Sequence, residues 1–142
     1  MLMAETKISS QLNDLLIQIG RSFLQYVDES WPWVSTAEQE SRQTLEDLAA
    51  NQRESVGALA RLLNEYGHFI DFGTYPTVYT SLHYVDVEFL LDQLEQNQAM
   101  IVKVCESTAT TVQSDSVSAN LLRDIAIAEQ RRLDELRKLA AK

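Results

Sequence analysis

Glycine and proline are scarce in this chain of 142 residues, which contains four Gly and two Pro. Ordinary usage is about 7 % Gly and about 5 % Pro, so the turns must be few and the segments between them long. This composition argues against a β-sandwich, a β-barrel and a glycine-rich nucleotide-binding loop. The chain is long enough to bury one sizeable core, and we expect a single domain over residues 1–142.

Cysteine is nearly absent as well. The single Cys105 cannot form an internal disulfide, and the first ten residues lack the basic start and apolar stretch of a secretory signal. We therefore expect a cytoplasmic protein. Cys105 falls on an apolar helical stripe, which predicts a buried and inert thiol.

Long apolar runs and an excess of positive charge are also missing. No run approaches the roughly 18 apolar residues that cross a bilayer, so we expect no membrane association. Twelve Lys and Arg stand against 21 Asp and Glu, which gives a net charge of -9. Because such a charge repels phosphate backbones, nucleic acid is not an expected partner.

What the sequence does contain is apolar residues at three- and four-residue spacing, the pattern of amphipathic helices. This pattern predicts four helices, at residues 6–30, 36–66, 81–107 and 116–140. Pro32 should end the first helix. Ser35 and Glu38 have the spacing of a capping box for the second helix, and Gly67 is a left-handed stop after it.

The last two helices carry weaker end signals. Thr80 or Ser81 can cap the third helix, and the small and β-branched residues at 107–111 should weaken its end. Asp115 or Ser116 then caps the fourth helix.

Residues 67–79 form the one long break in the helical pattern, with two of the four glycines, one of the two prolines, two Phe and two Tyr. We expect this aromatic crossover to pack along the helices and to let the second and third helices run parallel. Large aromatic residues at the connections should close the ends of the assembly, or mark a partner surface if they are exposed: Trp31, Trp33, Tyr75 and Tyr79.

Functional sites in helical bundles are usually built from inward-facing polar side chains. Five polar residues interrupt the apolar stripes: Gln52, Ser55, Gln98, Glu129 and Arg132. Arg132 offers a permanent cation with five donors, and Glu129 lies one turn before it, so we predict that the two pair near the bundle axis. The alternative is that both reach solvent at the edge of the stripe.

Two helix pairs joined by a long crossover, with polar residues at mid-bundle, resemble the ferritin-like superfamily, and especially its small rubrerythrin-related bundles. The likeness runs through the segments LEDLAANQRESVGALARLLNEYG and LLRDIAIAEQRRLDELRKL. It implies an all-α, ferritin-like four-helix bundle with a long aromatic crossover between the second and third helices.

Di-iron and di-manganese members of that superfamily place a Glu on the first and third helices and a Glu-x-x-His on the second and fourth. At the matching positions this chain has Ile19, Gln52 with Ser55, Gln98, and Glu129 with Arg132. One carboxylate without a histidine cannot hold two such cations, which need several anionic oxygens. The resemblance therefore implies a lost metal site and no cofactor.

We expect a non-catalytic bundle that acts as an interaction or structural module, with a protein partner or as a homodimer. The alternative is an iron-handling or oxidase protein that binds iron or manganese through other ligands: Glu54, Glu95, Glu129, His68 and His83. A small ligand held in a cavity of the core is a third alternative.

Overall fold

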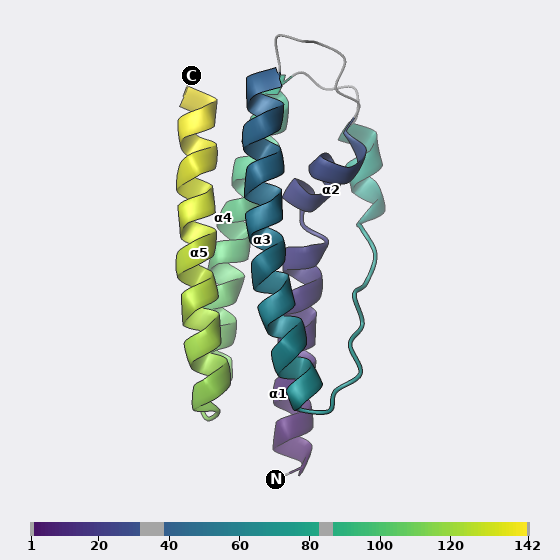
Figure 1. Ribbon diagram of the computed structural model, residues 1–142, viewed down its shortest axis with the longest axis vertical. Coiled ribbons are helices and arrows are strands. Elements are labelled where there is room, and N and C mark those ends of the chain that lie inside the picture. The colour runs from purple at the N-terminus through teal and green to yellow at the C-terminus, as the bar shows by residue number, and fades with distance from the viewer. Residues whose placement is uncertain (1, 32–38, 83–86, 142) are drawn as a thin grey trace.

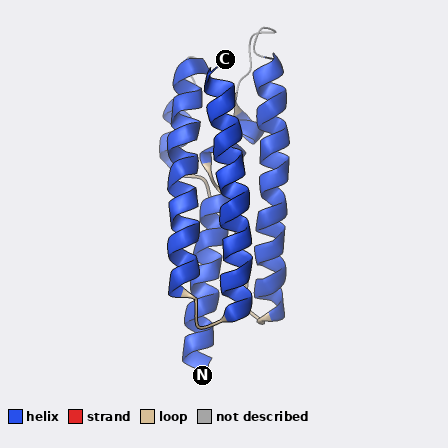
Figure 2. Cartoon of the chain, turned by 90° about the vertical axis from the view of Figure 1, so that its left-hand side faces the viewer, coloured by secondary structure: helices blue, strands red, loops and turns tan. Residues whose placement is uncertain are grey.

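Every regular element of the computed structural model is a helix within the residues that it describes, 2–31, 39–82 and 87–141. The elements are α1 (Leu2–Gly20), α2 (Phe23–Ser30), α3 (Gln39–Glu65), the 3₁₀ helix η2 (Thr77–Leu82), α4 (Val87–Thr111) and α5 (Ser116–Ala141). Figure 2 shows these helices and the loops that join them. The predicted all-α class is confirmed for this part of the chain.

The long helices pack side by side, α1 against α3 and α4, and α5 against the same two helices. In Figure 1, α1 and α5 run upward, whereas α3 and α4 both run downward. The segment after α3 returns from the lower end of that helix towards the top of the molecule. This return allows α3 and α4 to be parallel although they are consecutive long helices.

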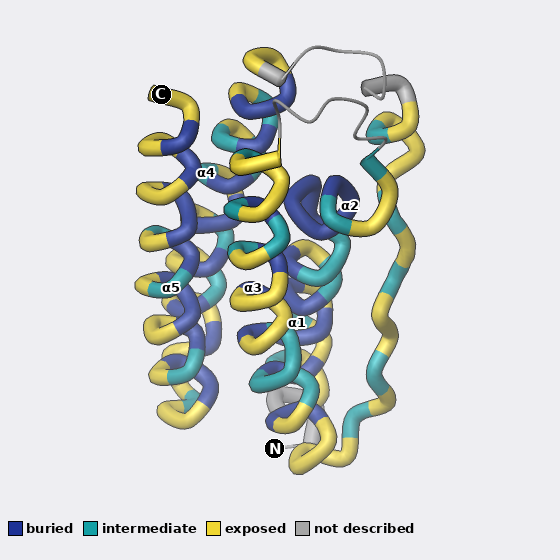
Figure 3. The backbone as a smooth tube through the Cα atoms, turned by 45° about the horizontal axis from the view of Figure 1, so that its top comes forward, coloured by how far each residue is buried: buried dark blue, intermediate teal, exposed yellow. Residues whose placement is uncertain are grey.

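The apolar core consists of two clusters at different levels along the helices. One combines buried residues that include Leu16, Leu59, Ile101 and Leu122. The other includes Phe23, Leu45, Leu90 and Leu136. Figure 3 shows the buried stretches on the sides of the helices that face one another. In each helical stretch, a buried polar residue lies in the sequence between the residues of one cluster and those of the other. These residues are Ser22 between α1 and α2, Gln52 of α3, Gln98 of α4 and Glu129 of α5.

The prediction of one helix over residues 6–30 was wrong, because the structure divides it into α1 and α2. Ser22 is extended (φ -68°, ψ 163°) and its hydroxyl accepts a hydrogen bond from the backbone N–H of Gln25. The N–H of Phe23 donates to the Asn97 side chain at 3.1 Å. These two hydrogen bonds satisfy backbone N–H groups at the start of a new helix. The apolar spacing continues across this point, so it did not indicate that a new helix starts here.

The predicted end of the second helix and start of the fourth are confirmed. Gly67 has φ +69°, its N–H donates to the carbonyl of Asn64, and His68 N–H donates to the carbonyl of Leu63. This pattern is a Schellman motif. At the start of α5, the carboxylate of Asp115 accepts from the backbone N–H groups of Val117 and Ser118, so Asp115 is the N-cap residue.

The third long helix does not weaken at residues 107–111 as predicted, because α4 continues to Thr111. The hydroxyl of Thr110 donates to the carbonyl of Glu106 at 3.3 Å, and that of Thr111 donates to the carbonyl of Ser107 at 3.0 Å. Each threonine hydroxyl therefore finds an acceptor within the helix, and α4 continues through these residues despite their modest helix preference.

Several predictions concern the gaps between the described ranges. The capping residues Ser35 and Glu38, the aromatic Trp33, and the first residues of the predicted helix 36–66 lie outside the described residues. Thr80 and Ser81 do not cap α4 directly, because both belong to η2, where the Thr80 hydroxyl donates to the carbonyl of Thr77 at 2.8 Å.

The crossover packs against the helices through part of its aromatic residues. Tyr75 and Tyr79 are half-buried, with ring centroids 5.3 Å from Tyr26 and 5.0 Å from Phe23 respectively. Together with Trp31 they pack against the apolar cluster that contains Phe23. Ile70 is also partly buried, against the cluster that contains Leu16. The prediction was wrong for three other apolar residues of this segment, whose exposed fractions are 89 % for Phe69, 51 % for Phe72 and 61 % for Val78.

Candidate functional site: a buried polar layer

A layer of polar side chains lies between the two apolar clusters. We define the polar layer as seven buried residues: Ser22, Gln25, Gln52, Ser55, Gln98, Glu129 and Arg132. All five polar residues that the sequence placed at mid-bundle belong to it. Within the described residues, no buried side-chain N or O atom is left without a hydrogen-bond partner. A fully satisfied layer of this kind fixes the register of the surrounding helices.

Glu129 is the centre of the layer and has no exposed surface. Its Oε1 accepts a hydrogen bond from Arg132 Nη1 at 2.6 Å. Its Oε2 accepts from Gln52 Nε2 at 3.1 Å and from Gln98 Nε2. Burial raises the pKa of the Glu129 carboxyl above its usual range, while the Arg132 guanidinium and the two amide donors act in the opposite direction.

Arg132 is 3 % exposed, so the alternative in which it reaches solvent is wrong. Besides Glu129, its Nη2 donates to the Ser55 hydroxyl at 3.1 Å and to the Asn51 carbonyl at 3.0 Å. Its Nε donates to the Asn51 side-chain oxygen at 3.1 Å. The guanidinium is therefore bound on each of its three nitrogens, which offsets the loss of hydration.

Asn51 was not predicted as a partner of Arg132. It lies at the exposed face of α3, next to Gln52 in the sequence. Asn51 is one position off the apolar stripe, so hydrophobic periodicity gives no sign of its contact with Arg132.

The first part of the chain contributes Ser22 and Gln25 in place of the predicted Ile19, which belongs to one of the apolar clusters. Gln52 Oε1 accepts from Ser22 Oγ at 3.0 Å and from Gln25 Nε2 at 2.9 Å. Ser22 and Gln25 are three residues apart, the spacing of Gln52 with Ser55. This spacing brings the pair into the layer only because a new helix starts after Ser22.

The layer connects to the surface through Gln25. The side-chain oxygen of Gln25 accepts from Arg53 Nη1 at 3.0 Å, and Arg53 forms an ion pair with Asp28 at 2.8 Å. A chain of hydrogen bonds therefore runs from the buried carboxylate of Glu129 through Gln52 and Gln25 to an exposed arginine.

Iron or manganese ions do not fit the polar layer. A two-metal centre needs several anionic oxygens, and Glu129 is the one carboxylate among the seven residues of the layer. Both oxygens of this carboxylate accept hydrogen bonds from N–H donors. The guanidinium of Arg132 already occupies the place beside Glu129 that a cation would take, and a metal ion there would repel it.

The alternative metal ligands that lie within the described residues do not form a metal-binding group. Glu54 is exposed, and Glu95 forms an ion pair with Arg137 at 3.0 Å. His68 follows the end of α3, and His83 lies outside the described residues. Within the described ranges, no group of three or more His, Cys, Asp and Glu side chains could hold a metal ion.

Cys105 has no exposed surface and is close to the polar layer. Burial raises the pKa of its thiol to about 12, and the charge of Glu129 acts in the same direction. A thiol with this pKa is protonated at neutral pH and is not a nucleophile.

Searches of protein-family models, characterised proteins and solved structures find no match to this chain. The chemistry of its own residues is therefore the basis for the function proposed below. None of the helices in the described ranges is long and apolar enough to span a membrane.

Proposed function

We propose that this chain is a ferritin-like four-helix bundle in which the buried Glu129–Arg132 ion pair stands in place of the metal centre. Three observations support this proposal. The long helices pack in a ring, α3 and α4 run in the same direction on either side of a long crossover, and polar side chains gather at one level. In ferritin-like proteins that bind two metal ions, the ligands come from this level of the bundle.

The ion pair is the observation that carries the non-catalytic part of the proposal. Catalytic groups must present a free lone pair, proton or open coordination position to a substrate. Glu129 and Arg132 are 0 % and 3 % exposed, and their polar atoms are bound to side chains and backbone of α3, α4 and α5. The layer is thus suited to holding the helices in register and unsuited to receiving a substrate.

The protein would then act as a structural or interaction module. Exposed apolar side chains on the crossover and on η2 support a surface for self-association, with Phe69 89 % and Val78 61 % exposed. Large exposed apolar residues dominate the energetics of interfaces. The buried thiol of Cys105 suits a reducing compartment such as the cytoplasm.

Two measurements on purified protein test this proposal. Elemental analysis of protein purified without chelator should find iron and manganese far below one equivalent per chain. Sedimentation equilibrium should find a dimer that dissociates in the double variant Phe69→Ser, Val78→Ser, while Met100→Ser, at another exposed apolar position, serves as the matched control. Stoichiometric metal would favour the iron-handling alternative, and a strict monomer would remove the self-association role.

A further inference from the structure

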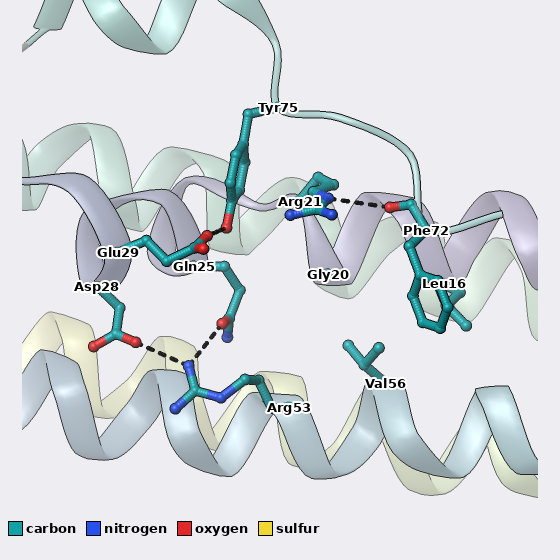
Figure 4. Close-up of a pocket in the computed structure, with 10 residues that line it drawn as sticks. All are labelled: Leu16, Gly20, Arg21, Gln25, Asp28, Glu29, Arg53, Val56, Phe72 and Tyr75. Atoms are coloured by element: carbon teal, nitrogen blue, oxygen red, sulfur yellow. Dashed lines mark hydrogen bonds and ion pairs between the residues drawn. The ribbon is translucent and has the colours of Figure 1, made fainter.

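A pocket of about 470 Å³ lies at the junction of α1 and α2. Residues of these two helices, of α3 and of the crossover line it. Figure 4 shows its lining, with an apolar side and a polar side. Leu16, Val56 and Phe72 form the apolar side, while Glu29, Asp28 and Arg53 lie towards the other side. Arg21 lies between the two sides. The pocket is large enough for a small organic molecule.

Two opposite charges in this pocket are not paired with each other. Arg21 donates from Nε to the carbonyls of Phe72 and Gly73, at 3.1 and 3.2 Å, and forms no ion pair with any described residue. Glu29 accepts a hydrogen bond from the Tyr75 hydroxyl and likewise forms no ion pair within the described residues. Asp28 and Arg53, by contrast, already neutralise each other at 2.8 Å.

Tyr75 contacts both of these charged side chains. The Arg21 guanidinium carbon lies 4.9 Å from the centroid of the Tyr75 ring, and the hydroxyl of the same ring donates to Glu29. The guanidinium of Arg21 is thus held by the two backbone carbonyls and by the Tyr75 side chain. It binds no carboxylate of the described residues, so its outward N–H groups can donate to the carboxylate of a ligand.

The crossover forms a fixed wall of the pocket. Gly73 has φ +67°, and a Cβ added there would lie 2.6 Å from the Ile17 side chain, so the backbone approaches α1 as closely as glycine permits. Asn13 and Asp71 exchange two hydrogen bonds, at 2.8 and 3.0 Å. A ligand would therefore meet a preformed site and would not have to order a loose segment.

We propose that this pocket binds a small zwitterion with an apolar group, of the class of apolar α-amino acids. Its carboxylate binds the Nη atoms of Arg21, and its ammonium group faces Glu29. Its apolar group covers Phe72, which is 51 % exposed, and contacts Val56. The four charged residues of the lining sum to zero, which suits a ligand of zero net charge and disfavours an ion of either sign.

A titration with three related probes tests this proposal. L-phenylalanine, 3-phenylpropionate and phenethylamine share a ring but carry both charges, the negative charge alone and the positive charge alone. Chemical shifts of backbone amides around Gly20 and Gly73 should saturate with L-phenylalanine at a Kd of about 1 mM or tighter. The two single-charge probes should bind at least about tenfold more weakly. The absence of saturable shifts, or equal affinity for the three probes, would overturn the proposal.

Variants of the two charged residues complete the test. Arg21→Gln and Glu29→Gln should each weaken binding of L-phenylalanine at least about tenfold, and Arg61→Gln, an exposed arginine of α3 outside the pocket, should leave it unchanged. If Arg21→Gln disturbs folding, Arg21→Lys retains the charge without the planar fork and should still weaken binding. Unchanged binding in Glu29→Gln and Arg21→Lys would overturn the proposal. Neither residue belongs to the polar layer, so a failure here leaves the proposed function standing.

Discussion

Arg132 and Glu129 lie one turn apart on α5, with Nη1 of the arginine 2.6 Å from Oε1 of the carboxylate, and the two side chains are 3 % and 0 % exposed. A charged pair removed from water is stable only when its remaining polar atoms are also bound. Here Asn51, Ser55, Gln52 and Gln98 provide those bonds.

Replacing one partner of the buried pair should destabilise the protein strongly. Arg132→Met leaves the Glu129 carboxylate buried beside an apolar group, so the free energy of unfolding should fall by about 3–5 kcal/mol. Arg131→Met is a matched control, because its side chain is exposed on the same helix, and it should change the value by less than about 0.5 kcal/mol. Urea unfolding followed by circular dichroism measures both. Similar losses in the two variants would show that Arg132 is not buried in solution.

The two residues should also be coupled. Glu129→Gln leaves the Arg132 cation without its counter-charge, and Arg132→Met leaves the opposite charge, whereas the double variant leaves neither. The double variant should therefore lose less stability than the sum of the single variants, by about 1–3 kcal/mol. A double-mutant cycle from four urea unfolding curves gives this coupling. Simple additivity would mean that the ion pair does not hold in solution.

How far the sequence predicts this structure depends on whether a feature follows helical periodicity. The five polar residues of the apolar stripes occupy positions that helical periodicity predicts to face the core. Helix α5 was also predicted from periodicity, and its bounds of Ser116–Ala141 differ from the predicted 116–140 by one residue. The break before α2 could not be read from periodicity, because the residues on both sides remain apolar and buried. It depends on a long-range cap, in which Asn97 of α4 accepts from the Phe23 N–H.

The same limit explains the partners that were missed. Asn51 binds Arg132 partly through its backbone carbonyl, and that carbonyl carries no sequence signal. Gln25 enters the layer only because α2 starts anew at Ser22 and turns its side chain towards Ala49 and Gln52. In both cases tertiary contact decided what a local pattern could not show.

Cys105 should resist thiol reagents until the protein unfolds. Its side chain is buried and its pKa is raised to about 12, so iodoacetamide at pH 8 should label it in urea and leave it unmodified in the native protein. Mass spectrometry of the labelled protein measures this difference. Rapid labelling of the native protein would place the thiol at the surface.

The raised pKa of Cys105 also predicts a pH dependence. The unfolded thiol loses its proton near pH 9, while the folded thiol keeps it up to a pKa of about 12. The stability that this group contributes is therefore fully present below pH 9 and is lost as the pH rises towards 12. Cys105→Ala should lose stability less steeply over that interval in urea unfolding series. An identical slope in the variant would contradict the predicted shift.

The close approach of the crossover to α1 should make Gly73 more sensitive than Gly67. Both have positive φ, but a Cβ at Gly73 would overlap Ile17, whereas a Cβ at Gly67 meets nothing within 4 Å. Gly67→Ala should cost about 1–2 kcal/mol for its left-handed backbone, and Gly73→Ala about 1–3 kcal/mol more for the added overlap. Thermal melts compare the two variants. Equal losses would show that the crossover does not pack this tightly.

Introducing ligands of the ferritin-like pattern beside Glu129 should create a metal site in the polar layer. Four substitutions place such ligands on α3, α4 and α5: Gln52→Glu, Ser55→His, Gln98→Glu and Arg132→His. These side chains replace the guanidinium beside Glu129 with carboxylates and imidazoles, which bind iron and manganese. The rebuilt variant should take up Mn²⁺ in calorimetric titration and melt at higher temperature with the metal than without it. Absence of uptake by a folded variant would count against the resemblance.

The central claim is that the Glu129–Arg132 pair fills the place of a metal centre, and the most direct test is a calorimetric titration of the unmodified protein with Mn²⁺. Because Arg132 already neutralises the one carboxylate of the layer, we predict no saturable heat of binding and no change in Tm. Saturable uptake of one or two equivalents, with a rise of several degrees in Tm, would contradict the account.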